Sequence, residues 1–236
     1  MSTSTAAVHS NIADTPQFWE RMWRSAGLQS AGLFIVAYFV YGNQPHVGAS
    51  AEALMAFYQG DRARILIAAV LIGLAVLNLM WFAAAIRVAL AEAGQDGWGA
   101  AATASSAALG GVLLLLITMS AALAYSIAGS ANPGVLGGLN DLAWTGLVMS
   151  SFPRAMLTMA AAFGLWRAKL ISNRLFGVGI LAVVLLLLAG TTWVSGGVWA
   201  VDGVFSRLIS PLICLLWLVV VSCVLLNRSS STHAGW

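Results

Sequence analysis

The chain has 236 residues, of which 60% are hydrophobic and only 8% are charged, whereas a typical soluble domain carries roughly 25% charged residues. Its formal net charge of +3 is too small for a nucleic-acid-binding surface, so no nucleic-acid partner is expected. Long uncharged stretches recur, each sufficient to cross about 30 Å of hydrocarbon as a helix. Because these stretches are continuously apolar and do not alternate, the sequence predicts an all-α, polytopic transmembrane helical bundle.

The N-terminal segment, residues 1–25, is polar and carries acids, so it is not typical of a cleavable secretory signal. Pro16 indicates a helix start, and Phe18, Trp19, Met22 and Trp23 gather on one side. This pattern predicts a cytoplasmic tail with a short interfacial amphipathic helix. We then predict six spans, at residues 26–42, 65–87, 100–128, 139–164, 175–195 and 207–226. A second polar tail, residues 227–236, follows the last span and is expected in the cytoplasm.

The segment between the first two predicted spans has the pattern of a surface helix. Ser50 is a good N-cap, and Leu54, Met55, Phe57 and Tyr58 follow it at helical spacing. We therefore expect a two-turn amphipathic helix that lies flat at the membrane surface.

The distribution of basic residues predicts the orientation of the bundle, because cytoplasmic loops are enriched in Lys and Arg. With the N-terminus inside, seven basic residues fall on the cytoplasmic side: Arg21, Arg24, Arg87, Arg167, Lys169, Arg174 and Arg228. Three fall on the outer side: Arg62, Arg64 and Arg207. The excess places both termini in the cytoplasm.

Small residues crowd the third predicted span. Ala104, Ala107, Ala108 and Gly111 form small-xxx-small pairs that allow close approach of two helices. The interpretation we favour is packing inside this bundle, and the alternative is a homodimer face.

Cysteine and histidine positions exclude several chemistries. Cys214 and Cys223 are nine residues apart in the last predicted span, so helical geometry places them on opposite faces as free thiols. The three histidines, His9, His46 and His233, lie outside the predicted spans, and no metal-ligand spacing occurs. We expect no metal and no cofactor.

Most charged residues near the spans have a structural interpretation. Asn140 and Asp141 are placed to cap the fourth span, and Asp202 is placed to cap the sixth. Asp61, Arg62 and Arg64 are expected to form a solvated cluster at the interface.

Arg154 has no such interpretation. It lies 13 residues after Asp141, about 20 Å along a helix, which is near the bilayer centre. A cation there costs about 2.5–3.5 kcal/mol on insertion scales. No acid lies at its depth, so its partners must be neutral. The candidates are the Met149 carbonyl, freed because Pro153 has no N–H, and the side chains of Asn78, Ser150 and Ser151.

Three interpretations of Arg154 remain open on the sequence. It ties helices together through neutral acceptors, or it forms a positive site for an anionic or carbonyl-bearing amphiphile. In the third interpretation the fourth span is disrupted and the arginine lies at the interface.

Two stretches resemble a broad group of uncharacterised bacterial six-helix integral membrane proteins. They are "AEALMAFYQGDRARILIAAVLIGLAVLNLMWFAAAIRVALAEAG" and "SSFPRAMLTMAAAFGLWRAKLISNRLFGVGILA". The shared features are an "FY" segment before the second span, an aromatic end that leads to a basic turn, and an "FP" step in the fourth span. The resemblance implies a bacterial inner-membrane location and no particular activity. Arg154 departs from that pattern, in which an apolar residue would follow the Phe-Pro step.

Three function classes follow, in decreasing order of preference. The first is a non-catalytic accessory or lipophilic-ligand-binding protein, the second a small transporter of an anionic or amphiphilic solute, and the third an intramembrane enzyme acting on a lipid or isoprenoid. An enzyme would need polar residues that converge at the outer end of the bundle, which we call the outer mouth. The candidates are His46, Glu52, Asp141 and Asp202. Membrane lipids are the expected surroundings, and a homo-oligomer or larger membrane complex stays open.

Overall fold

The computed structural model describes residues 14–129 and 132–231, and all its regular elements are helical. Within these residues there is no β-strand, and Val194 and Ala200 form an isolated bridge. The all-α prediction is confirmed. The elements are α1 (Asp14–Tyr41), α2 (Ala51–Gly60), α3 (Arg62–Glu92), α4 (Asp96–Tyr125), η1 (Ile127–Gly129), α5 (Pro133–Met149), α6 (Ser151–Arg167), α7 (Asn173–Ala189), η2 (Phe205–Ile209) and α8 (Ser210–Ser231).

Three helical segments in the described part of the chain are long and apolar enough to cross a membrane: Arg62–Glu92, Asp96–Gly129 and Phe205–Asn227. Helix α7 is also apolar but shorter. The protein is therefore helical with candidate membrane spans, as expected for a membrane protein.

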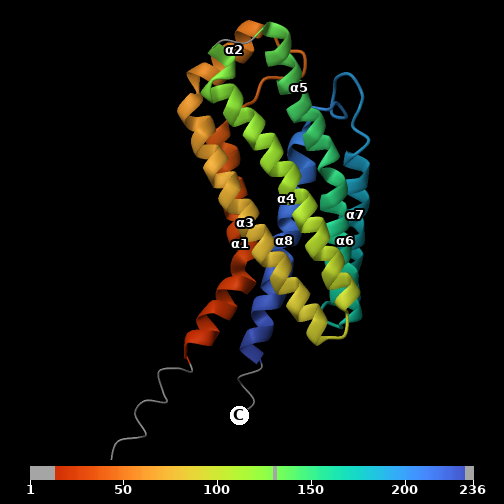
Figure 1. Cartoon of the computed structure of the whole chain (residues 1–236). Helices are drawn as coiled ribbons and strands as arrows, with labels where there is room; N and C mark the ends of the chain where they lie inside the picture. The colour runs from red at the N-terminus through yellow and green to blue at the C-terminus, as the bar shows by residue number, and fades with distance from the viewer. Residues whose placement is uncertain (1–13, 130–131, 232–236) are drawn as a thin grey trace, which may run out of the picture.

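The long helices pack side by side into a bundle (Figure 1). Helix α3 packs between α1 and α4, α6 packs against α4 and α7, and α8 packs against α1. Helix α1 begins and α8 ends at the same end of the bundle, which we call the terminal end. Helix α2 lies at the opposite end, which we call the α2 end.

Three apolar clusters hold the bundle together. The largest one joins α3, α4, α6 and α8 through residues such as Phe82, Ile86, Leu165 and Leu225. A second cluster lies at the α2 end and includes Tyr58, Leu123 and Leu136. A third, small cluster joins α6, α7 and α8. Close van der Waals packing of this kind stabilises helix association in membranes, where lipid chains are as apolar as leucine.

The amphipathic helix predicted between the first two spans is present as α2. The Ser50 Oγ accepts a hydrogen bond from the Ala53 N–H at 3.3 Å, which caps the helix as predicted. Leu54, Phe57 and Tyr58 are buried and Met55 is exposed. The helix therefore lies against the end of the bundle with its apolar face inward. At its C-terminus Arg64 Nη1 pairs with Asp61 Oδ1 at 2.9 Å in an exposed cluster, as predicted.

The two predicted caps of later spans are wrong. Helix α5 begins at Pro133, and the side chain of Asn132 caps it by accepting from the Gly134 N–H at 2.8 Å. An Asn-Pro pair is well suited to this start, because proline at the first helical position loses no hydrogen bond. Asn140 and Asp141 therefore lie well inside α5. Asp202 is in the turn before η2 and caps no helix, because its carboxylate accepts hydrogen bonds from a different segment.

The small-residue stripe of the third predicted span faces outward, so the favoured interpretation of packing inside the bundle is wrong. Ala104, Ala107, Ala108 and Gly111 are exposed. The other face of α4 packs inside instead, through Ala102, Ser105, Ser106, Leu109 and Gly110. Two adjacent small-residue stripes occur in this stretch, and composition alone could not choose between them.

The predicted ends of the chain and the fourth span differ in detail from the structure. Helix α1 runs from Asp14 to Tyr41 without a break at residue 25, and α8 continues to Ser231. The rest of the predicted tails, residues 1–13 and 232–236, lies outside the described residues. The predicted fourth span consists of α5 and α6, which meet at Ser150.

A ligand-sized cavity with one buried arginine

A cavity of about 480 Å³ lies between α1, α3, α4, α5 and α8. This volume is within the range of small-molecule sites, about 300–1,000 Å³. Most of its lining is aliphatic or aromatic, and includes Phe34, Leu79, Leu109, Leu113, Leu116, Ile117, Leu147 and Leu215. The charged residues in the lining are Arg154 and Arg207. The cavity is therefore apolar along its length, with cationic groups and no acid.

Arg154 points into the bundle and is 6% exposed. Its Nε donates to the Ser150 carbonyl at 3.2 Å, and its Nη2 donates to the Leu147 carbonyl at 2.9 Å and to Ser150 Oγ at 2.7 Å. Its Nη1 donates to Ser210 Oγ at 3.0 Å. Nη1 carries two hydrogens, and one acceptor is present for it among the described residues. One N–H of a buried guanidinium is therefore available at the cavity wall.

The positive charge of Arg154 has no counterion in the described part of the chain. The ion pairs found there join His46 to Asp202 and Asp61 to Arg64. All acceptors around Arg154 are neutral carbonyls or hydroxyls. Neutral acceptors satisfy hydrogen bonds but do not compensate a charge, and an uncompensated buried charge is costly. A bound anionic group would supply the missing counterion, whereas a carbonyl oxygen would add only one more neutral acceptor.

Helix geometry explains why Arg154 finds these partners. Helical side chains lean toward the N-terminus of their own helix, so Arg154 reaches back over the α5–α6 junction to residues seven and four positions earlier. Ser150 is held in place because its Oγ donates to the Leu147 carbonyl at 2.6 Å. The partner on α8, Ser210, ends the π-helix η2, where its N–H bonds to the Phe205 carbonyl.

The residues that the sequence suggested around Arg154 are only partly brought together. Ser150 contacts Arg154 twice. Asn78 is half-buried, and its Nδ2 donates to the Leu74 carbonyl of its own helix at 2.9 Å. Ser151 is buried, but its Oγ has no hydrogen-bond partner. The carbonyl that Arg154 uses belongs to Leu147, whereas we expected Met149.

Sequence reasoning missed Ser210 as a partner and placed Arg207 only in the topology count. Arg207 lies in η2 and Ser210 is the first residue of α8. Arg207 Nη2 donates to Asn43 Oδ1 at 2.5 Å. The adjacent Pro211 was the available signal, because proline removes an N–H and is typical of an irregular helix start.

Neutral polar groups close the cavity at the α2 end. The Tyr41 hydroxyl donates to Ser120 Oγ at 3.0 Å, and Gln44 Nε2 donates to Asn140 Oδ1 at 3.1 Å. The Tyr58 hydroxyl donates to the same Asn140 oxygen at 3.1 Å. Burial raises the pKa of Tyr58 well above its ordinary value, and repulsion from Tyr41 adds to this. The Tyr58 hydroxyl therefore stays neutral and serves as a donor.

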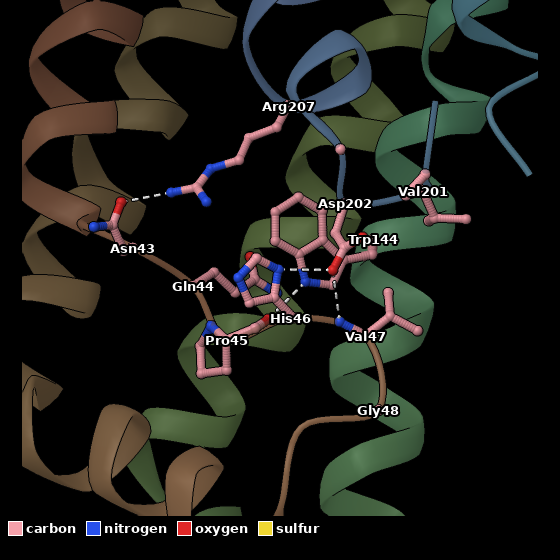
Figure 2. A network of polar contacts seen from close by, with 12 residues as sticks. Asn43, Gln44, Pro45, His46, Val47, Gly48, Trp144, Val201, Asp202 and Arg207 are labelled. Carbon is pink, nitrogen blue, oxygen red and sulfur yellow. Dashed lines mark hydrogen bonds and ion pairs between the residues drawn. The ribbon is translucent and has the colours of Figure 1, made fainter. Parts of the chain in front are cut away.

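Residues 42–50, which we call the connector, cross this end of the bundle (Figure 2). Trp144 Nε1 donates to the Pro45 carbonyl at 2.8 Å, and Asn140 Nδ2 donates to the His46 carbonyl at 3.3 Å. The Gly48 N–H donates to Asp141 Oδ1 at 3.1 Å. The connector is thus fixed by side chains of α5.

Asp202 fixes the connector from the other side. Its Oδ2 is 2.8 Å from His46 Nδ1 and accepts from the Val47 N–H at 3.1 Å (Figure 2). Partial burial tends to raise the pKa of Asp202, but the hydrogen bonds from His46 and Val47 outweigh it, and the net pKa is lowered. The carboxylate is therefore held in its ionised form.

Three of the four polar residues expected at the outer mouth thus meet at the connector: His46, Asp141 and Asp202. Glu52 lies apart on the exposed first turn of α2, where hydrogen bonds from its own N–H and from Ser50 lower its pKa. The two aspartates accept hydrogen bonds from backbone N–H groups of the connector, so their role is to hold the connector in place. No group of metal-binding side chains was found among the described residues.

Comparison with known proteins found no family model, no curated protein and no solved structure that matches this chain. The features of this chain that indicate a function are therefore the cavity and its two arginines.

Proposed function

We propose that this protein is a six-span, multi-pass protein of the bacterial inner membrane with both termini in the cytoplasm. The spans would be α1, α3, α4, α5 with α6, α7 and α8. The proposal is supported by the common end at which α1 begins and α8 ends (Figure 1), because an even number of crossings returns the chain to one side. It is also supported by the seven-to-three excess of Lys and Arg on that side.

Its function, in this proposal, is to bind a lipophilic molecule that carries an anionic or carbonyl group. The observation that supports this is the buried Arg154 in the wall of an apolar cavity, with neutral acceptors only and one Nη1 hydrogen available. A guanidinium is well suited to bind the oxygens of a carboxylate or a phosphate. The apolar walls would hold the hydrocarbon part of the ligand.

The test is ligand binding by an Arg154→Leu variant in lipid nanodiscs, with a fluorescent single-chain carboxylate as the probe. Loss of hydrogen bonds to a charged group, worth about 1.5–3 kcal/mol, should weaken the Kd about ten- to a hundredfold. Arg154→Lys should restore binding only partly, because an ammonium has three donors and cannot replace the four contacts to the helices and also bind a ligand.

The matched control is Arg167→Leu, which removes an exposed arginine from the same helix. It should bind the probe as the wild type does. If Arg154→Leu also binds as the wild type does while it stays folded, Arg154 only ties helices together, and the binding proposal is wrong.

A transporter is the second candidate. It is favoured by two interruptions beside Arg154: the α5–α6 junction at Ser150 and the π-helix η2 before Ser210. Transporters commonly place substrate sites at discontinuous helices. Uptake of an anionic amphiphile into proteoliposomes, lost in Arg154→Leu, would support transport over binding alone.

A further inference from the structure

The lining of the cavity reaches the surface of the bundle between α1 and α8. Ile35, Tyr38 and Phe39 of α1 line the cavity and are also 43%, 42% and 76% exposed. On α8, Leu212 also lines the cavity and is 41% exposed. Side chains that belong to both an internal cavity and the outer surface form the rim of an opening. We call these four residues the rim.

The opening lies nearer the α2 end, because α1 and α8 come together toward the terminal end. There Arg24 Nη1 donates to the Leu225 carbonyl at 3.2 Å, and Gly27 leaves no room for a Cβ beside Ser222 Oγ. Toward the α2 end the rim residues of both helices line the cavity. The close contact between helices thus bounds the opening on one side.

Arg207 bounds the opening on the other side. It precedes α8 and lines the cavity, and its Nη2 reaches Asn43 Oδ1, just after α1, at 2.5 Å (Figure 2). The end of the bundle beyond it is covered by the connector and by the network of Tyr41, Gln44 and Asn140. The route along the bundle axis is therefore closed by hydrogen-bonded groups, and the route between α1 and α8 is apolar and open.

We propose that this opening is a lateral portal for a single-chain amphiphile with a small anionic head group that is dissolved in the surrounding membrane. The inference rests on the proposed function. The rim is apolar, so it suits a hydrocarbon chain that arrives from lipid. A cavity of about 480 Å³ suits one chain. Arg207 at the edge and Arg154 inside offer two successive cationic contacts for the head group.

The test compares rates with equilibrium affinity, using stopped-flow binding of 11-(dansylamino)undecanoic acid to the protein in nanodiscs. Leu212→Trp should narrow the portal and slow association and dissociation at least about tenfold, with Kd changed less than about threefold. The control is Leu216→Trp, which adds the same bulk on α8 at a residue that is 64% exposed and outside the cavity lining. It should leave both rates unchanged.

A second pair of variants, on α1, tests the portal independently in case Leu212→Trp does not fold. Tyr38→Trp should slow both rates, and Val36→Trp, 50% exposed and outside the lining, should not. Palmitate and hexadecyl phosphate should both displace the probe, and hexadecanol should compete at least about tenfold more weakly. The ratio of the two anions then shows which head group is preferred.

The outcomes separate the two proposals. If both rim variants keep wild-type rates while Arg154→Leu weakens Kd, the portal is wrong and the binding site stands. If hexadecanol competes as well as palmitate, the anionic head group is wrong. If the wild type binds neither the probe nor the competitors, both proposals fail.

Discussion

Two adjacent serines at the junction of α5 and α6 are both buried but have opposite surroundings. Ser150 Oγ accepts from Arg154 and donates to the Leu147 carbonyl, so it links the guanidinium to α5. Ser151 Oγ has no hydrogen-bond partner. Buried polar groups stabilise a protein only when they are paired, and an unpaired one is a cost.

We therefore expect opposite effects from the same substitution at the two sites. Ser150→Ala should lower the free energy of unfolding by about 1–3 kcal/mol, because it removes an acceptor from a buried cation. Ser151→Ala should be neutral or slightly stabilising, because it deletes an unpaired hydroxyl. Thermal unfolding in detergent, followed by tryptophan fluorescence, measures both. Equal destabilisation by the two substitutions would contradict the assigned contacts of Arg154.

At the scale of elements, the connector is the segment whose position depends most on side-chain hydrogen bonds. The contacts that fix it are those of Asn43 with Arg207, Gln44 with Asn140, Pro45 with Trp144, Gly48 with Asp141, and His46 and Val47 with Asp202. Helix α2 follows at once and is set by the Ser50 cap and by burial of Leu54, Phe57 and Tyr58. A short segment without secondary structure is thus held over the α2 end.

The lowered pKa of Asp202 predicts how pH affects this segment. Because the folded-state pKa is depressed, the stabilising contribution of Asp202 is fully present above the ordinary Asp pKa of about 3.9 and is lost as pH falls through the folded-state value. A spin label at Val47→Cys, with the native cysteines replaced, should be immobile near neutral pH. It should become mobile only in strong acid. The side chain of its partner His46 is largely exposed, so solvent screens the pair and the effect on global stability should be small.

The control for this experiment is Asp202→Asn in the same labelled background. Its label should be more mobile than that of the Asp202 protein near neutral pH, because a neutral amide oxygen is a weaker acceptor than the carboxylate for the hydrogen bonds from His46 and Val47. A label that stays immobile in strong acid, or in Asp202→Asn, would show that α5 alone holds the connector.

For the whole molecule, the proposed topology places α2 outside and the α6–α7 turn in the cytoplasm. With Cys214 and Cys223 replaced, an impermeant maleimide applied to intact cells should label Gln59→Cys. It should label Ser172→Cys only after permeabilisation. The reverse pattern would overturn the orientation that we infer from the Lys and Arg count.

The two native cysteines fit the helical register of the last span. Cys214 is buried beside the cavity and Cys223 is exposed, and both are free thiols, as predicted. Their separation along one helix already excluded a bond between them. The same periodicity could not show which side of the helix would face the cavity.

Amino-acid composition and spacing by themselves determined the helical class, the cap and apolar face of α2, and the need of Arg154 for neutral acceptors. These properties are local or follow from solvation: a helix satisfies its own backbone, Ser50 caps the residues next to it, and no acid shares the depth of Arg154. Only the tertiary structure decided which acceptors are used. Ser210 is 56 residues from Arg154 and Asp202 is 156 residues from His46.

The same distinction explains what the sequence misplaced. Asn140 and Asp141 have the composition of a cap, but Asn132 and Pro133 start the helix earlier, and the two residues then serve the distant connector. On α4, two small-residue faces lie next to each other, and packing against α3 and α6 determined which one turned inward. Partners far apart in the chain are selected by packing between helices, which leaves no periodic pattern in the sequence.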